Sequence, residues 1–213
     1  MPGARLQSFR IGDVAEALAG VMLKRIAFVT SVPREEDVGH DFICSISEND
    51  GKLIKAGPSF AVQVKANDRP IVYKKGHAIN WIANQENPFF IIICDVKTES
   101  LRVFSTWNML NAFLLKGGKP VRLIPKTPKK GKKDIQWITK GSNKEPQLDI
   151  YLGRPILEFS SKDLVDKQKA AFFADTLKEW ILLDRENIVR RAAKMYWVSG
   201  PTSYATNQSL QEI

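Results

Sequence analysis

The 213-residue chain is poor in cysteine and histidine and has no long apolar run. Its two cysteines, Cys44 and Cys94, lie in apolar, strand-like stretches without metal-ligand spacing, so we expect two buried reduced thiols, as in a cytoplasmic protein. Two histidines are too few for a zinc site built on histidine. No stretch approaches the roughly 18 apolar residues of a membrane span, and residues 1–10 lack the apolar segment of a signal peptide. Walker A, dinucleotide-binding and nucleophile-elbow motifs are also missing, which leaves the common NTPase, Rossmann and hydrolase classes without support.

Acidic residues are outnumbered: 23 Asp and Glu stand against 32 Lys and Arg, giving a net charge of +9. Such an excess favours an anionic partner, and nucleic acid rather than a membrane, because no basic amphipathic helix with bulky apolar anchors is present. Residues 126–133 contain five lysines together with Pro and Gly, which predicts a flexible basic loop. The loop is either a solvated linker or an arm that contacts phosphate through Lys129, Lys130, Lys132 and Lys133. Lys74 and Lys75 are further candidates for phosphate contact, with a turn before a helix as the alternative.

The hydrophobic pattern predicts an α/β protein in which helices flank a mixed central sheet. We expect an α/β core over residues 1–120, a lysine-rich loop and added strand completing it over 121–159, and a C-terminal helical extension and tail over 160–213. The extension could dock a partner protein or a second copy of the chain.

The expected helices are 12–26, 77–84, 107–115 and 160–197. We expect the last of them to be capped by Ser160 or Ser161 and broken near Leu183-Asp184. The expected strands are 41–47, 59–66, 89–94, 101–104 and 150–159, with a polar turn over 48–58.

The strand expected at 59–66 carries polar residues where a buried strand should be apolar. Gln63 and Lys65 are two positions apart and therefore lie on one face. A buried lysine without a partner costs several kcal/mol, so a carboxylate, a metal site or an anionic substrate must lie opposite. Asp41, at the start of the preceding apolar strand, is the nearest candidate, and Glu16 lies beside the apolar stripe of the first helix. The same residues also allow an interior Asp41–Lys65 salt bridge to which Gln63 is bonded.

This order of residues resembles the PD-(D/E)XK nuclease superfamily, and in particular its Mrr-like branch with Gln in the third motif. The shared features are a helix with Glu16, a strand with Asp41, the Gln63-Val64-Lys65 strand and a following helix. The Gly-Xaa-Asp and Val-Gln-Val-Lys segments, a helix with Trp81, and an apolar strand ending in Asp also resemble a family of uncharacterised, predicted nucleases. The resemblance covers about residues 12–115 and implies a restriction-endonuclease-like core.

The resemblance implies an endonuclease dependent on Mg²⁺ or Mn²⁺ that hydrolyses phosphodiester bonds in DNA, in restriction or phage defence. Asp41, the Gln63 amide oxygen and the Val64 carbonyl would hold the metal. Lys65 would orient the attacking water or stabilise charge in the transition state, with Glu16 completing the site. Gln63 stands where the family usually has an acid, which should weaken metal affinity. The alternative is therefore a catalytically inactive protein of the same fold that binds nucleic acid or serves as an assembly subunit.

Two further polar residues have competing interpretations. His40 stands where the family usually has a small apolar residue; a surface position is the commoner interpretation, and lining the site entrance or contacting phosphate the others. Asp95, at a strand end, invites a metal role, but a turn-forming Asp is the favoured interpretation.

Overall fold

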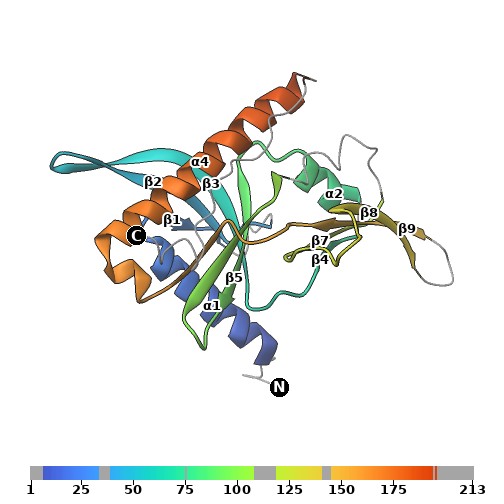
Figure 1. Ribbon diagram of the computed structural model, residues 1–213, viewed down its shortest axis with the longest axis horizontal. Coiled ribbons are helices and arrows are strands. Elements are labelled where there is room, and N and C mark those ends of the chain that lie inside the picture. Colours follow the sequence, from blue (N-terminus) through green and yellow to red (C-terminus); the bar gives the residue numbers. More distant parts are fainter. Residues whose placement is uncertain are drawn as a thin grey trace.

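The computed structural model describes residues 7–33, 39–74, 76–107, 119–140, 145–193 and 195. In this part of the chain two sheets are flanked by helices (Figure 1). The larger sheet has the order β1 (Ala27–Ser31), β2 (Phe42–Asp50), β3 (Leu53–Lys65), β5 (Phe89–Asp95), β6 (Ser100–Ser105) and β10 (Leu157–Ser160). The smaller sheet has the order β4 (Ile71–Tyr73), β7 (Val121–Ile124), β9 (Glu145–Tyr151) and β8 (Ile135–Lys140). The helices are α1 (Gln7–Leu23), α2 (Gly76–Ala83), the short 3₁₀ helix η2 (Asp163–Val165) and α4 (Lys167–Ala192).

The larger sheet is mixed. Strands β1, β2 and β3 form an antiparallel meander, and β3 then pairs in parallel with β5. Parallel neighbours need a crossover connection, which here contains β4 and α2. The α/β class with a mixed sheet and a C-terminal helix is therefore confirmed.

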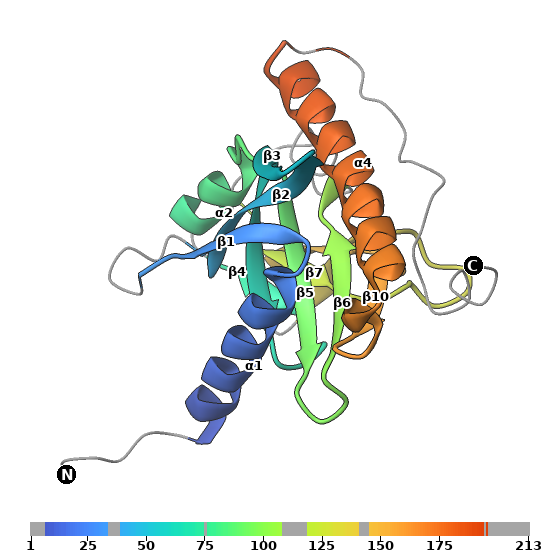
Figure 2. The ribbon, with the colours of Figure 1, turned by 90° about the vertical axis from the view of Figure 1, so that its left-hand side faces the viewer.

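Helices and the second sheet cover both faces of the larger sheet. On one face, the even-numbered residues of β3, such as Val62 and Val64, pack in one core with α1 and α4. On the other face, Ala61 of β3 and Ile91 of β5 pack with α2 and the smaller sheet. Figure 2 shows α2 and α4 on opposite sides of the strands. Strand β5 is buried along Phe89–Cys94 because both of its faces are covered, as its continuous apolar sequence predicts.

The β2–β3 hairpin is longer than the sequence pattern suggests. The turn expected over 48–58 is wrong: β2 continues to Asp50, β3 begins at Leu53, and only Gly51 and Lys52 turn. Gly51 has a φ of +62°, the left-handed conformation that favours glycine. The hairpin projects beyond the body of the molecule (Figure 1), so its polar residues are exposed in strands rather than in a turn, and Leu53 and Ile54 are exposed with them.

Helix α4 is continuous through Leu183 and Asp184, so the predicted break is wrong. Its N-cap is Asp166, whose carboxylate accepts hydrogen bonds from Gln168 N and Lys169 N, rather than Ser160 or Ser161. Apolar residues of α4 pack in the same core as α1, so the helix is part of that core: Phe173, Leu177, Trp180 and Ile181.

Other expectations have mixed outcomes. The strand predicted over 150–159 is two strands, because β9 ends at Tyr151 and β10 begins at Leu157. The helix predicted over 107–115 lies outside the described residues apart from Trp107. Strands β1, β4, β7 and β8 were not anticipated, since such short segments have little periodicity of their own.

Both cysteines are buried and free, as expected. Burial raises the pKa of Cys44 to about 12 and that of Cys94 to about 11, so both remain protonated thiols near neutral pH. Among the described residues, no helix has the length and apolar character needed to cross a membrane.

Candidate functional site

Asp41 lies at the point where strand β2 begins, beside the end of β3. Its backbone N–H donates to the Val62 carbonyl at 2.9 Å, and its Oδ2 accepts from the Val64 N–H at 2.6 Å. Just before β2 begins, the carboxylate therefore accepts the hydrogen bond that a backbone carbonyl of β2 would otherwise accept. Because the N–H and C=O of one strand residue point to the same side, the Val64 carbonyl faces the side on which Asp41 lies.

Gln63 lies on the face of β3 that is turned away from α1, and it meets β4 there. The Tyr73 hydroxyl donates to Gln63 Oε1 at 3.4 Å. Burial raises the pKa of Tyr73, and the negative charge of Asp41 raises it further, so the hydroxyl stays protonated and remains a donor. The structure thus brings Asp41 and Gln63 together and adds Tyr73, a residue that the sequence alone did not single out.

Lys65 follows on the same face as Gln63 and is half-buried. Among the described residues its side chain has neither an ion pair nor a hydrogen-bond partner. The interior Asp41–Lys65 salt bridge allowed by the sequence is therefore not formed in this structure. A half-buried lysine on the same face as Gln63, without a protein partner in the described part of the chain, is suited to bind an anion.

An aromatic group supports this end of the sheet from α2. His40 is buried, contrary to the favoured surface position, and donates from Nε2 to Gln85 Oε1 at 2.9 Å. Its ring lies 4.9 Å from Trp81 and 5.3 Å from Phe89, and Trp81 stacks on Tyr73. His40 therefore holds the chain next to Asp41 in place, and no role in phosphate contact follows from its position.

Gly39 is required where the chain passes Trp81. Its φ is +95°, and a Cβ there would lie 2.7 Å from Trp81 Cη2. We expect Gly39→Ala to lower the free energy of unfolding by about 1–2 kcal/mol from the backbone conformation alone. Chemical denaturation checks this, with Gly131→Ala as a matched control, because Gly131 also has a positive φ, +84°, but has open space around it. Equal losses of unfolding free energy in the two variants would show that Trp81 moves aside without destabilising the protein.

Glu16 lies on α1, which packs on the α1–α4 side of the larger sheet. Glu16 lines a hollow of about 320 Å³ beside α1 together with Asp13, Lys24 and Ser31, and Asp41, Gln63 and Lys65 are not among its lining residues. Helix α1 packs on the face of β3 opposite to Gln63, because its core partners are the even-numbered residues. The sequence placed Glu16 in the correct order along the chain but could not specify the face of the sheet.

The predicted phosphate contacts are exposed where the structure describes them. Lys74 is exposed directly after β4, whereas Lys75 lies outside the described residues. The four loop lysines are exposed between β7 and β8: Lys129, Lys130, Lys132 and Lys133. Asp95 accepts from Lys97 N at 2.9 Å, and hydrogen bonds within this turn lower its pKa, so the turn interpretation of Asp95 is confirmed.

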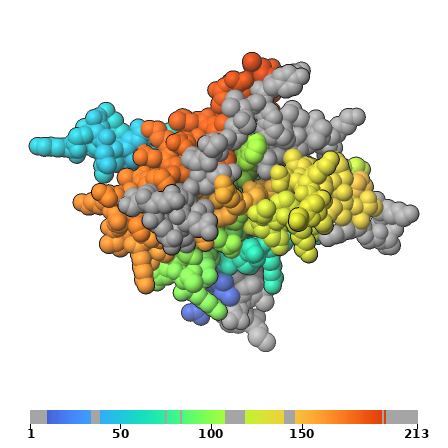
Figure 3. Space-filling model, viewed as in Figure 1, coloured from blue at the N-terminus to red at the C-terminus, as the bar shows by residue number. Residues whose placement is uncertain are grey.

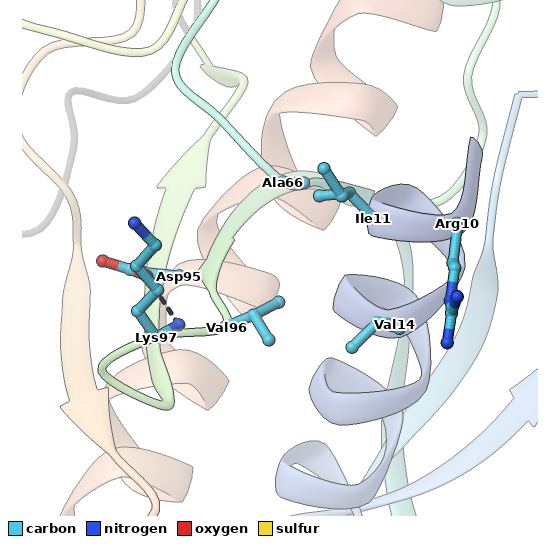
Figure 4. Close-up of a pocket in the computed structure, with 7 residues that line it drawn as sticks. All are labelled: Arg10, Ile11, Val14, Ala66, Asp95, Val96 and Lys97. Atoms are coloured by element: carbon cyan, nitrogen blue, oxygen red, sulfur yellow. Dashed lines mark hydrogen bonds between the residues drawn. The ribbon is translucent and has the colours of Figure 1, made fainter. Parts of the chain in front are cut away.

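A second hollow, of about 510 Å³, lies between α1 and the ends of β3 and β5 (Figure 4). Its lining is largely apolar, with Ile11, Val14, Ala66 and Val96 as the central residues. The carboxylate there, Asp95, already accepts a hydrogen bond from a backbone N–H of its own turn. The hollow has none of the candidate catalytic side chains, so it is separate from the group around Asp41.

The donor set around Asp41 fits a hard divalent cation bound weakly. Mg²⁺ needs only one or two carboxylates, with waters and substrate phosphate completing its shell. Asp41 supplies the charged oxygen, and Gln63 Oε1 retains a lone pair after accepting from Tyr73. Across the described ranges, no group of three or more His, Cys, Asp and Glu is placed to hold a metal ion.

Comparisons with family models, with curated proteins and with solved structures found no match to this chain.

Proposed function

We propose that this protein is a metal-dependent nuclease that hydrolyses phosphodiester bonds, with DNA as the expected substrate and Asp41, Gln63 and Lys65 as its site. One observation carries the proposal: Lys65 is half-buried without a protein partner in the described structure, on the same face as Gln63 and at the strand end where Asp41 lies. Burial of such a cation is favourable only when an anion binds beside it.

The order of elements supports the restriction-endonuclease-like interpretation. Helix α1 is followed by the antiparallel β1–β2–β3 meander, then by α2 and by β5 in parallel with β3. Asp41 precedes the middle strand of the meander, and the Gln-Val-Lys segment ends the third. A helix with Glu16, a strand after Asp41, the Gln-Val-Lys strand and a following helix are in the order that the resemblance to PD-(D/E)XK nucleases implies. Restriction or phage defence remains an expectation that comes from the resemblance alone.

Each residue has a defined task in this proposal. Oxygens of Asp41, Gln63 and Val64 would hold Mg²⁺ or Mn²⁺. The bound cation would neutralise phosphate charge and favour deprotonation of the attacking water. Lys65 would place its ammonium group against the phosphate oxygens, where negative charge grows in the transition state. Tyr73 would orient the Gln63 amide so that its oxygen, and not its NH₂ group, faces the site.

The alternative is a protein of the same fold that binds nucleic acid or assembles with a partner without cleavage. The single carboxylate among the three metal-facing groups favours it, because one charge less weakens cation binding. Cleavage of plasmid and linear DNA in Mg²⁺, Mn²⁺ or EDTA separates the two proposals. Metal-dependent cleavage supports the nuclease, whereas binding that falls steeply with salt and ignores divalent ions supports the alternative.

The Tyr73 hydroxyl offers a conservative test of the site geometry. We expect Tyr73→Phe to reduce cleavage about tenfold and to raise the Mg²⁺ concentration needed for half-maximal rate, because Gln63 loses the donor that orients it. Excess Mg²⁺ should restore part of the rate, which a purely structural defect would not allow. An unchanged Mg²⁺ requirement would mean that Tyr73 does not act through Gln63.

A further inference from the structure

The positive charge of the chain is concentrated in one segment. Residues 119–154 contain ten Lys and Arg and three Asp and Glu, a net charge of +7 out of +9 for the whole chain. One of the three acids, Asp149, is fully buried and paired with Arg122, whose Nε lies 2.9 Å from Oδ1. The segment forms β7, the lysine loop, β8 and β9, and Figure 3 shows the loop and β8 as a continuous surface, coloured yellow. This surface is suited to a polyanion.

A large aromatic side chain is exposed on the strand that follows the lysine loop. Trp137 lies on β8, the edge strand that follows the lysine loop, and is 48% exposed. Lys132 and Lys133, in the loop that leads into β8, are exposed cations. An exposed indole ring among lysines is the combination with which proteins bind unpaired nucleotides, because bases stack on the ring while the lysines contact phosphates.

The β-sheet register links Trp137 to the candidate site. Tyr73 is opposite Val121, Val121 is beside Leu148, and Leu148 is opposite Trp137. Paired residues in a sheet share a face, so the four form one row across the smaller sheet, in which Val121 and Leu148 are buried and Trp137 is exposed at the edge. Three strand spacings separate Tyr73 from Trp137, which is about 14 Å. An unpaired strand bound at Trp137 has to span this distance to reach the site.

We propose that the β8 edge, formed by the lysine loop and Trp137, binds an unpaired nucleic-acid strand and presents it to the site near Tyr73. This inference rests on the proposed function and specifies its substrate as single-stranded. Stacking on Trp137 requires a base whose face is free, and in a duplex both faces of each internal base are already stacked. Loop lysines bind phosphates of either form, so Trp137 is the residue that distinguishes the two.

The test measures binding in EDTA, where no cleavage takes place. The probes are labelled oligothymidylate, oligouridylate and a duplex of equal length, followed by fluorescence anisotropy over a range of salt concentrations. We expect the wild type to bind oligothymidylate more tightly than the duplex. Trp137→Ala should weaken binding to oligothymidylate about tenfold, leaving duplex affinity and the salt dependence unchanged, while Trp137→Phe should stay within about threefold. Comparing the two unpaired probes decides between DNA and RNA as the source of the strand.

Two further variants complete the design. Alanine at all four loop lysines should weaken binding to every probe and reduce the slope of log affinity against log salt by about 3 for the unpaired probes, from ~0.7 per phosphate contact. Val165→Ala is the matched control, because Val165 is 77% exposed and lies on η2, in another part of the fold. Thermal unfolding confirms that each variant is folded.

Three results would overturn the inference: no binding to any probe, tighter binding to the duplex, or equal affinity of Trp137→Ala and wild type for oligothymidylate. None of them depends on cleavage. A protein that binds unpaired strands through Trp137 but never cleaves would retain this inference and lose the nuclease proposal. Cleavage by the wild type, together with an unchanged affinity of Trp137→Ala for oligothymidylate, would support the nuclease proposal and overturn this inference.

Discussion

Asp41→Asn is expected to reduce metal-dependent cleavage at least about a hundredfold, a change of about 2.7 kcal/mol in transition-state free energy. Asp41 is the one carboxylate among the three groups proposed to hold the cation, and Asn has nearly its shape without its charge. The side-chain oxygen of Asn can still accept the hydrogen bond from Val64 N–H, so the start of β2 should be preserved. Initial rates of plasmid nicking over a range of Mg²⁺ concentrations measure the effect.

Comparison of Asp41→Ala with Asp41→Asn separates the hydrogen bond that Asp41 accepts from the effect of its charge. Alanine removes both, leaving the Val64 N–H without its acceptor, so we expect an additional loss of about 1 kcal/mol in the free energy of unfolding. Lys65→Ala should also abolish cleavage but spare stability, because Lys65 has no protein partner in the described structure. Cleavage that survives in Asp41→Asn at wild-type rates would exclude this site as the nuclease centre.

The stability of the protein is expected to fall as the pH rises from about 4 to about 8, through Asp184. This side chain of α4 is 2% exposed, Ser105 donates to it, and its Oδ1 has no hydrogen-bond partner in the described part of the chain. Burial raises the pKa of Asp184 from 3.8 to about 8. The native state then holds a proton that the unfolded state releases above pH 4, so rising pH favours unfolding until about pH 8 and has no further effect through this group.

The expected loss is on the order of 5 kcal/mol across the whole window, at about 1.4 kcal/mol per pH unit. Between pH 6 and pH 8 it is about 2 kcal/mol. Asp184→Asn has no proton to lose, so its free energy of unfolding should not show this fall. Urea denaturation at pH 6, 7 and 8 and constant ionic strength measures both proteins, and their difference cancels the titration of other groups. Parallel curves for wild type and Asp184→Asn would show that Asp184 is ionised in the native state.

Part of the candidate site follows from the sequence alone. Gln63 and Lys65 interrupt an apolar strand with a period of two, so their shared face could be predicted without coordinates. Asp41 precedes the neighbouring apolar run, and two strands joined by a short polar segment are expected to pair. The structure places Asp41 beside Gln63 and Val64 in agreement with that reasoning.

The remainder of the site depends on contacts between distant segments. Tyr73 reaches Gln63 from a three-residue strand, which is too short to show a pattern. Gly39 is required by Trp81, a residue forty-two positions later, and no local rule connects them. The side of β3 on which α1 and Glu16 lie is set by the core against which α1 packs, and no local pattern specifies it.

The sequence by itself determined the properties that depend on near neighbours. The continuous apolar run Phe89–Cys94 specified a strand buried on both faces, the net charge of +9 specified an anionic partner as the expectation, and the alternation around Gln63 specified a polar face. Hydrophobic periodicity and net charge depend only on the identity and spacing of residues along the chain, so they can be read without the three-dimensional structure.

Only the tertiary structure decided the properties that depend on which segments meet. It set α4 into the same core as α1, buried Asp184 against Ser105, and aligned Tyr73 with Trp137 in one row of the smaller sheet. Each of these changes the solvation or the neighbours of a residue through chain segments that are remote in sequence. Solvation and strand register are therefore the two quantities that the fold contributes to the function proposed for this protein.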